Sequence, residues 1–292
     1  MSDSSYQEYC QNLWDKHLDA SFDDPLNLAL KNGLTWLPWI GKDYNATDGR
    51  LLIVGESHYS GEPDIEKVAQ NKAKMSANQK ETREVIAEYP LEGLAAGWER
   101  NNPTYDNLHR ALLKTDLLSP DDKKKRVLLW RQISYYNFVQ RPMDCGDGRR
   151  ERPIPGDYLK GWPIFIRLIT ILRPKTCVFI GVEASNVFNR AMKDLGIKHS
   201  PIQRGESLNN VYTRVGGSVT ICGATTNIIC MKHTSQYFSW QLWNKYLERI
   251  MPEDMAYFRR AVLGGEPKKQ ANATKLEELT KKTDIVLGNF YQ

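Results

Sequence analysis

Residues 51–59 have the sequence LLIVGESHY, in which four aliphatic residues and a glycine lead directly into polar and aromatic side chains. A short apolar run that ends in glycine is typical of a strand buried inside a parallel sheet. In such sheets, ligands bind at the edge formed by the carboxyl ends of the strands. The run 51–54 therefore predicts a central strand, and the side chains after it are candidates for chemistry.

Three further apolar runs predict buried strands: 133–139, 176–182 and 227–231. Segments with apolar residues at helical spacing lie between the strands: 105–114, 161–172 and 184–195. Strands that alternate with helices indicate a sheet covered by helices. We therefore expect an α/β protein, a three-layer α/β/α sandwich with a mainly parallel four-stranded central sheet.

The other parts of the chain have different patterns. In VYTRVGGSVTICGATT (211–226), two β-rich runs on either side of Gly216 and Gly217 predict a hairpin with a primed turn. We expect residues 1–50 to form helices and loops packed on the core and residues 51–262 to form the main domain. Residues 263–292 are expected to be a polar C-terminal extension.

The composition is that of a globular protein, since 41% of the 292 residues are hydrophobic and 26% are charged. The net charge of +5 permits nucleic acid binding but does not require it. Five scattered cysteines without a C-x-x-C motif argue against a disulfide framework. No apolar run approaches the roughly 20 residues that span a membrane, and the N-terminus has no signal-peptide pattern. We expect a cytoplasmic monomer that does not bind a membrane.

The residues around the predicted strand ends include an acid, an amide and a histidine. Glu56 follows the first strand, Asn137 lies within the second, and His233 follows the last. Because parallel strands end at the same edge of a sheet, we expect these three side chains to converge on one rim.

The sequence G-E-S-H-Y also has some features of a degenerate nucleophile elbow, in which Ser57 would attack an acyl group. Two features oppose this. Tyr59 replaces the small residue that lets such a strained turn close, and no clear strands precede residue 51, although the hydrolase fold builds several strands first. A serine hydrolase is kept as an alternative.

Taken in order, the motifs resemble those of the uracil-DNA glycosylase superfamily. G-E-S-H-Y at 55–59 is similar to that family's G-E-x-P-G or G-Q-D-P-Y loop, and Asn137 followed by Arg141-Pro142 is similar to its second strand. RPKTCVFIGVEA (173–184) and His233-Thr234-Ser235 are similar to its third strand and its final H-P-S. NPTYDNLHRALL (102–113) resembles its segment with a base-stacking aromatic. The resemblance covers residues 50–245.

The departures from the family also carry expectations. His58 and Thr234 stand where the family usually has proline, so we expect both loops to be shaped differently. Ser57 stands where some members have aspartate, so the carboxylate is expected to be Glu56 or to come from elsewhere in the chain. Gln140 lies near the position of one cysteine that binds an iron–sulfur cluster in some relatives, and no N-terminal cysteine pair is present. We therefore expect no cluster, metal or other cofactor.

The resemblance implies a DNA glycosylase that flips out uracil or another modified pyrimidine and hydrolyses its N-glycosidic bond. Glu56 would stabilise positive charge on the deoxyribose or orient water, and His233 would donate to O2 of the leaving base. Asn137 would recognise the Watson–Crick edge of the base. No lysine is placed as a Schiff-base nucleophile, so we expect no strand-cleaving activity.

Further residues are expected to bind the base and the DNA. Tyr105 would stack on the flipped base, with core packing as its alternative, and Tyr59 and Ser57 would line the base pocket. Phosphate contacts are expected from Ser60, Lys232 and Ser235. Gln236 and Tyr237 would wedge into the vacated stack, with packing of the aromatic residues of QYFSW (236–240) on the core as the alternative.

Two alternatives within the same fold stay open beside the serine hydrolase. The first is an enzyme specific for a different lesion or for a hypermodified phage base, which the altered loops would allow. The second is a nucleic-acid-binding protein that has lost catalysis.

Overall fold

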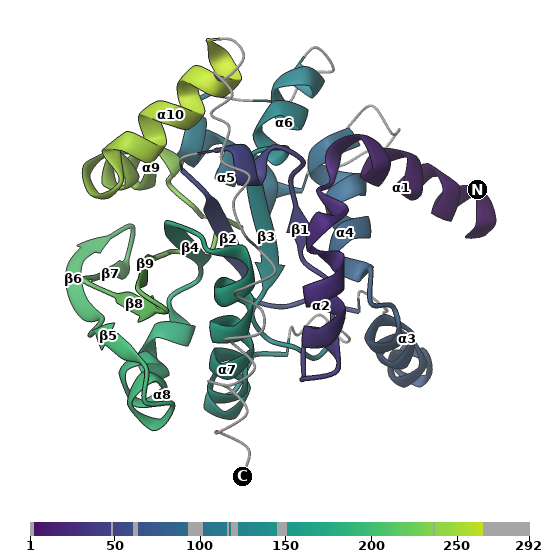
Figure 1. Cartoon of the computed structure of the whole chain (residues 1–292), viewed down its shortest axis with the longest axis horizontal. Helices are drawn as coiled ribbons and strands as arrows, with labels where there is room; N and C mark the ends of the chain where they lie inside the picture. The colour runs from purple at the N-terminus through teal and green to yellow at the C-terminus, as the bar shows by residue number, and fades with distance from the viewer. Residues whose placement is uncertain are drawn as a thin grey trace.

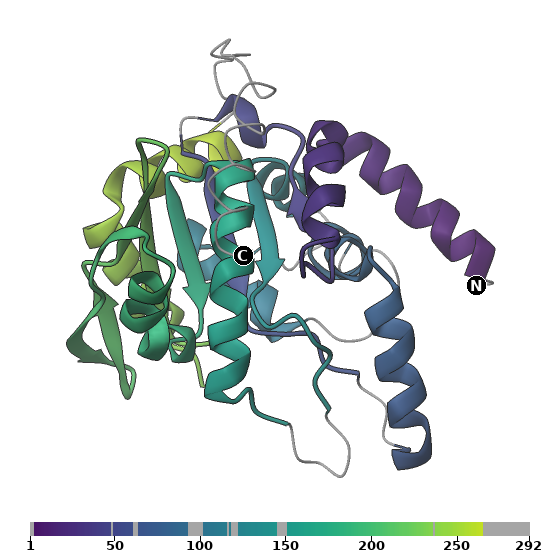
Figure 2. The same cartoon turned by 60° about the horizontal axis from the view of Figure 1, so that its bottom comes forward.

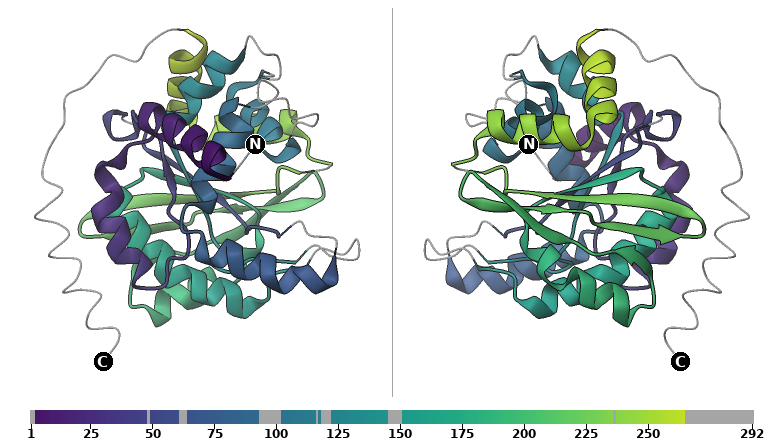
Figure 3. Two further views of the ribbon diagram at one scale, coloured as in Figure 1. Left: turned by 90° about the vertical axis from the view of Figure 1, so that its right-hand side faces the viewer. Right: turned by 90° about the vertical axis from the view of Figure 1, so that its left-hand side faces the viewer.

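The computed structural model describes residues 3–47, 49–60, 64–92, 102–115, 117, 122–144, 151–235 and 237–264. A single mixed sheet lies at the centre of this part of the chain, with helices around it (Figure 1). Figure 3 shows helices both above and below the sheet. The protein is therefore an α/β protein, as expected.

Four parallel strands form the middle of the sheet, in the order β3-β2-β4-β9. They are β2 (Leu51–Gly55), β3 (Ile133–Asn137), β4 (Thr176–Ile180) and β9 (Ala224–Met231). Every residue of β2, β3 and β4 is buried, which fits their mainly apolar sequences. The four predicted strands are confirmed, with ends that differ by one to three residues.

The sheet extends beyond these four strands to nine strands in the described residues. β1 (Trp39–Ile40) pairs antiparallel with β3 at one side, in a segment for which we expected only helices and loops. At the other side lie β5 (Lys198–Ser200), β6 (Gln203–Leu208), β7 (Val211–Val215) and β8 (Ser218–Ile221). These strands make the sheet mixed, and larger than the four strands expected.

The predicted hairpin across Gly216 and Gly217 is wrong. β7 and β8 do not pair with each other, because both pair antiparallel with the same strand, β9. Arg214 lies opposite Cys230 and Ser218 lies opposite Asn227, so β7 and β8 pair one after the other along the same side of β9 and together act as one interrupted strand. The two glycines mark an irregularity within that interrupted strand, as glycine in a strand commonly does.

The hairpin turns lie before β7 and after β8. Asn209 and Asn210 join β6 to β7 with φ of 52° and 62°, and Cys222 and Gly223 join β8 to β9 with φ of 49° and 79°. Two consecutive positive φ angles define the primed turn that fits the twist of antiparallel strands. Primed turns are therefore present, but at different residues from those predicted.

Alternate residues of the central strands face two separate cores. Leu51 and Ile53 pack with α5 (Pro103–Leu113), α6 (Lys123–Trp130), α9 (Trp240–Ile250) and α10 (Pro252–Leu263). Leu52 and Val54 pack with α2 (Asp23–Leu30), α7 (Pro155–Leu172) and α8 (Phe188–Asp194). Figure 2 shows α7 in front of the central strands and running along them. This alternation follows from the two-residue period of a strand.

The three predicted helices correspond to α5, α7 and the region of α8. α7 begins six residues earlier than predicted, because Pro155 takes the first helical position and Asp157 accepts the Ile154 backbone N–H at 3.0 Å. The third begins as a 3₁₀ helix, Glu183–Val187, and continues as α8. Gly196 follows it with φ of 63°, as expected of a residue just beyond a helix end.

The remaining helices are α1 (Asp3–His17), α3 (Ile65–Ala77), α4 (Glu81–Ile86), a π-helical segment (Ala87–Glu92) and short 3₁₀ helices at Ala20–Phe22 and Tyr44–Ala46. Within the described residues, no helix has both the length and the apolar character that crossing a membrane would require. The C-terminal extension beyond residue 264 lies outside the described residues.

Candidate functional site

The carboxyl ends of the four parallel strands meet at one edge of the sheet, and we call the segments that follow them the carboxyl rim: 56–60, 138–144, 181–187 and 232–239. The first two segments continue to pair beyond their strands. Val139 N–H donates to the Glu56 carbonyl at 2.8 Å, and Met143 N–H donates to the His58 carbonyl at 2.8 Å. These hydrogen bonds hold the backbone of the G-E-S-H-Y segment against the segment that follows β3.

Glu56 directs its carboxylate toward the face of the sheet covered by α7. Its Oε1 accepts a hydrogen bond from the Tyr158 hydroxyl at 2.8 Å, and a Cβ placed on Gly181 would lie 4.0 Å from the same oxygen. Burial raises the pKa of the Glu56 carboxyl, while the Tyr158 hydrogen bond and the charge of Arg152 lower it and Glu183 raises it. Perturbed carboxyls at sheet edges are common at active sites.

Asn137 is buried, and both ends of its amide are hydrogen-bonded. Nδ2 donates to His58 Nε2 at 2.9 Å, and Oδ1 accepts from the Tyr135 hydroxyl at 3.1 Å. An amide offers two N–H donors and two acceptor lone pairs, so one donor and one lone pair remain for a ligand. A recognition role for Asn137 is compatible with these contacts and stays a prediction.

His58 occupies the position where the related family has proline, and it is buried. Its Nε2 lies 2.8 Å from the Thr82 hydroxyl of α4, and its ring packs edge-on against Trp36 at 4.8 Å between centroids. Burial lowers the pKa of His58 to about 3, so the imidazole is neutral at physiological pH. No role was predicted for His58 from its sequence position.

Tyr105 is buried in an aromatic cluster on α5's side of the sheet. Its ring stacks on Tyr89, with 6.5 Å between centroids, and meets Trp130 and Tyr135 edge-on. Its hydroxyl also hydrogen bonds the Tyr135 hydroxyl. These contacts are those of the core-packing alternative, and base stacking by Tyr105 stays a prediction.

The loop after β9 is anchored to α5. Asn107 Nδ2 donates to the Thr234 carbonyl at 2.8 Å and to the Ser235 carbonyl at 3.2 Å. His233 Nδ1 accepts the Ser235 backbone N–H at 3.3 Å, so the neutral ring carries its proton on Nε2. The arrangement makes His233 Nε2 a hydrogen-bond donor.

Glu56 and His233 follow β2 and β9, and only β4 lies between these two strands. Neighbouring strands are about 4.8 Å apart, so the two segments begin roughly 10 Å from each other along the rim. Asn137 lies on β3, the other neighbour of β2. The three predicted residues are therefore brought to one edge of the sheet.

The tip of the loop after β9 presents one exposed aromatic ring. Tyr237 is 88% exposed and has φ of 59°, a left-handed conformation that is unusual for tyrosine. Lys232 Nζ donates to the Tyr237 carbonyl at 2.9 Å and to the Asn209 carbonyl at 3.3 Å, so this ammonium braces the loop. The next residue, Phe238, is buried and stacks on Trp243.

The other predicted contacts are placed as follows. Gln236 lies outside the described residues. Tyr59 packs against the core on the α7 side of the sheet, and its hydroxyl lies 3.4 Å from the Glu151 carbonyl.

The hydroxyl oxygens of Ser57 and Ser60 are buried and have no hydrogen-bond partner within the described residues. No general base therefore contacts Ser57 there, and the geometry gives no support to a serine nucleophile.

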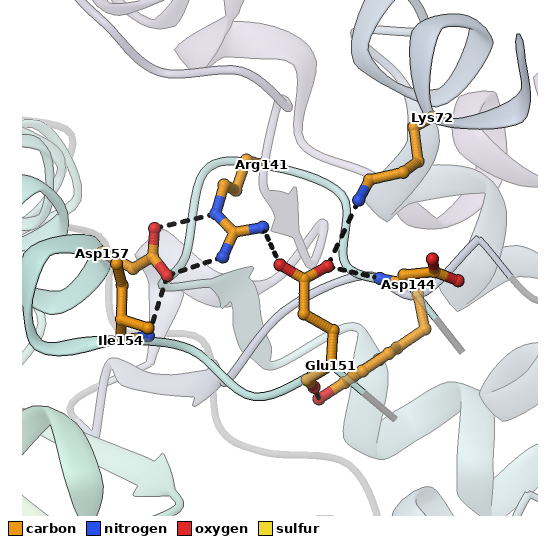
Figure 4. Close-up of polar contacts among 7 residues, drawn as sticks. Lys72, Arg141, Asp144, Glu151, Ile154 and Asp157 are labelled. Carbon is orange, nitrogen blue, oxygen red and sulfur yellow. Dashed lines mark hydrogen bonds and ion pairs between the residues drawn. The ribbon is translucent and has the colours of Figure 1, made fainter. Parts of the chain in front are cut away.

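Arg141 is the centre of an ion-pair network that fixes the segment after β3 (Figure 4). Its guanidinium binds both carboxylate oxygens of Asp157 at 2.8 Å and Glu151 Oε1 at 2.6 Å. Glu151 Oε2 also binds Lys72 Nζ at 3.2 Å and the Asp144 backbone N–H at 2.8 Å. The network ties α3 and the start of α7 to the rim, and the sequence did not predict it.

Gln140 ties the rim to the N-terminal segment. Its Oε1 accepts the Thr35 N–H at 2.7 Å, and its Nε2 donates to the Asn137 carbonyl at 2.5 Å. Within the described residues, no three histidine, cysteine or acidic side chains gather as a metal site would require. The expectation that no cluster is bound stays a prediction.

A cavity of about 450 Å³ lies at the other end of the strands. It is lined by Lys175 and Thr176 at the start of β4, by Gly216 and Gly217, and by the junction of α9 and α10. Lys175 is ion-paired there with Asp254 at 3.5 Å, and Thr176 donates to Asp254 at 2.9 Å. Because these polar groups bind each other and ligands of parallel sheets bind at carboxyl ends, the rim is the stronger candidate site.

Comparison of the chain with models of known protein families gave no match, and comparison with curated proteins gave none.

Proposed function

We propose that the protein is a DNA glycosylase that removes uracil or another modified pyrimidine, built on a three-layer α/β/α sandwich of the uracil-DNA glycosylase type. The observation that supports this most is the position of three residues at the same edge of the sheet. Glu56, Asn137 and His233 follow or end three of the four central parallel strands. An acid, an amide and an imidazole are the groups that this reaction requires.

In the proposed reaction, the bond between the deoxyribose and the base breaks with positive charge on the sugar and negative charge on the base. Glu56 would face the sugar as a carboxylate and stabilise that positive charge or orient water. His233 Nε2–H would donate a hydrogen bond to O2 of the leaving base, which needs no full proton transfer. The site would hold one nucleoside across the end of β4.

Contact with DNA would come from the loop after β9. Tyr237 is fully presented to solvent, and its backbone is held by Lys232, so little ordering would be needed before it enters a base stack. Ser235 lies on the rim segment 232–239 and would bind a phosphate, whereas the expected phosphate contact of Ser60 would require its buried hydroxyl to become accessible. Removing a base from the duplex costs a few kcal/mol, which such a wedge would offset.

A specific observation supports a modified pyrimidine other than uracil as a second candidate. His58 replaces a proline of the related loop and hydrogen bonds the Asn137 amide, so the wall of the base pocket differs from that of the family. The substrate panel must therefore include naturally modified pyrimidines.

The test is cleavage of oligonucleotides that carry one uracil or one modified pyrimidine, single- or double-stranded, with alkali to break abasic sites. The wild-type protein should create abasic sites at one of these bases. Glu56→Gln should slow the reaction by roughly 10²–10⁴-fold, the range for a positioned catalytic carboxyl. Glu253→Gln, at the exposed start of α10, should match the wild type. A folded wild-type protein that attacks none of the substrates would overturn the proposal.

A further inference from the structure

Two aromatic rings are the only exposed ones among the phenylalanine, tyrosine and tryptophan residues that the structure describes, and both lie near the carboxyl rim. They are Tyr237, on the loop after β9, and Tyr212, on β7. Arg214 of β7 lies opposite Cys230 of β9, so Tyr212 lies two residues nearer to the rim. Lys232 Nζ donates to the Tyr237 carbonyl and to a carbonyl of the turn before β7, which ties this end of β7 to the loop.

A β-bulge in β6 places Arg204 on the same face of the sheet as Tyr212. Tyr212 of β7 pairs with Ser207 of β6. Two residues further along β7, the partner of Arg214 is Arg204, which lies three residues from Ser207. Side chains of a strand alternate between faces, so without the extra residue Arg204 would point to the other face. The bulge contains Gly205, where a Cβ would come within 3.0 Å of a side-chain oxygen of β7.

The side chains of Arg204 and Tyr212 stack on each other at the surface. The guanidinium carbon of Arg204 lies 3.3 Å from the centre of the Tyr212 ring, and the Tyr212 residue is 43% exposed. In the part of the chain that the structure describes, no acidic side chain forms an ion pair with Arg204, and Glu206 pairs instead with Arg249 of α9. β6 is also an edge strand, so this pair is open to a ligand (Figure 1).

Arg214 holds this part of β7 against the rim segment that follows β4. Its Nε donates to the Ser185 hydroxyl at 3.0 Å, and its Nη2 donates to Asn186 Oδ1 at 3.2 Å. Its Nη1 donates to the Tyr212 carbonyl at 2.7 Å. The backbone that carries the Tyr212 ring is therefore fixed before any ligand binds, which lowers the entropic cost of binding.

We propose that Arg204 and Tyr212 form a stacking platform, which binds an unpaired base of single-stranded DNA beside the rim. Aromatic rings and guanidinium groups bind bases of any sequence by stacking, and the positive charge attracts the phosphate backbone. β7 lies about 5 Å from β9, the strand that leads into His233, so the platform would hold a nucleotide close to the one at the rim. The faces of bases inside a duplex are covered by neighbouring pairs. This inference rests on the proposed function and adds single-stranded DNA as its substrate class.

The test measures the binding of two fluorescent single strands of about 12 nucleotides, a length typical of single-strand sites. One is undamaged oligo-dT, and the other is an abasic strand of equal length and charge. Tyr212→Ala should weaken the binding of oligo-dT roughly 5- to 100-fold, the range for one lost base stack, and should leave the binding of the abasic strand nearly unchanged. Tyr212→Phe keeps the ring and should bind both strands as the wild type does.

Two arginine variants separate stacking from charge. Arg204→Ala should weaken the binding of oligo-dT more than that of the abasic strand, and it replaces Tyr212→Ala in the test if that variant does not fold. Arg190→Ala is the matched control, because Arg190 is an exposed arginine of α8 that is paired with Asp194. Its effect should be small and equal for the two strands, since it removes only charge.

The platform is overturned if folded Tyr212→Ala or Arg204→Ala binds oligo-dT as the wild type does, or weakens both strands equally. Either result would leave the glycosylase proposal intact. Failure of the wild-type protein to release any base would overturn the glycosylase proposal, whereas the binding measurement uses undamaged DNA and still decides whether the platform exists.

Discussion

Gly55 lies directly opposite Asn137 in the parallel pairing of β2 with β3, and a Cβ at Gly55 would come within 3.0 Å of Asn137 Oδ1 and of the Tyr135 hydroxyl. Gly55 has no side chain, so the side chains of Asn137 and Tyr135 can lie directly against its backbone. A larger residue at this position would displace the hydrogen bond between the Tyr135 hydroxyl and Asn137 Oδ1.

Gly55→Ala should therefore destabilise the protein and disturb Asn137. We expect the free energy of unfolding to fall by about 1–3 kcal/mol, the usual cost of overpacking a buried site. Gly156→Ala is the matched control, since a Cβ there meets only Ile154 at 3.9 Å. Urea unfolding of both variants checks this, and equal stability of the two would contradict it.

Tyr158→Phe should change the pH dependence of activity. The Tyr158 hydrogen bond lowers the pKa of Glu56, so its loss should raise that pKa further and move the acid limb of kcat/KM to higher pH. The kcat/KM of the variant should therefore fall below that of the wild type on the acid limb and match it at higher pH, where the carboxyl is ionised in both proteins. Tyr136→Phe removes a buried hydroxyl that contacts the Phe138 carbonyl on the same face and should leave the profile unchanged.

Tyr237 and Phe238 should respond in opposite ways to replacement by alanine. Tyr237→Ala should leave the melting temperature unchanged and should slow base release from duplex DNA more than from single strands, because its exposed ring would act only as a wedge. Phe238→Ala should lower stability by about 3 kcal/mol, because its ring stacks on Trp243 in the core. Equal effects of Tyr237→Ala on both DNA forms would argue against the wedge.

The protein should lose stability in acid because two histidines are buried in their neutral form. Burial lowers the pKa of both His58 and His109 to about 3, below the value of 6.5 in the unfolded chain. The unfolded state therefore binds more protons below pH 6.5, and stability falls from there toward pH 3, by up to about 1.4 kcal/mol per pH unit for each histidine.

His109→Gln should flatten this loss, since a glutamine oxygen can accept the Trp130 indole N–H that now donates to His109 Nε2. Urea unfolding between pH 4 and pH 8 measures the effect. Wild-type and variant curves should run parallel above pH 7, where both histidines are neutral in the folded and unfolded states. Parallel curves below pH 6 as well would show that His109 does not carry the effect.

The four central strands could be predicted because β2, β3, β4 and the last four residues of β9 are buried, and their sequences are mainly apolar. β1 could not be predicted, since two residues, Trp39 and Ile40, carry no pattern and become a strand only by pairing with β3. The hairpin was misplaced because a glycine pair suits a kink as well as a turn. The true turns use Asn209-Asn210 and Cys222-Gly223.

Some residues of the candidate site could be predicted from the sequence, and others could not. Glu56, Asn137 and His233 could be placed together because strand ends fix their position at the rim. Their partners could not, because Tyr158 and Thr82 come from helices distant in sequence, and only packing brings them to Glu56 and His58.

Identification of the released base by mass spectrometry tests the glycosylase proposal most directly. Purified protein incubated with uracil-containing DNA should liberate free uracil in an amount equal to the abasic sites formed. Glu56→Gln, folded to the same extent, should liberate almost none. Release of no base from uracil-containing or naturally modified DNA, or equal release by both proteins, would contradict the proposed role of the rim.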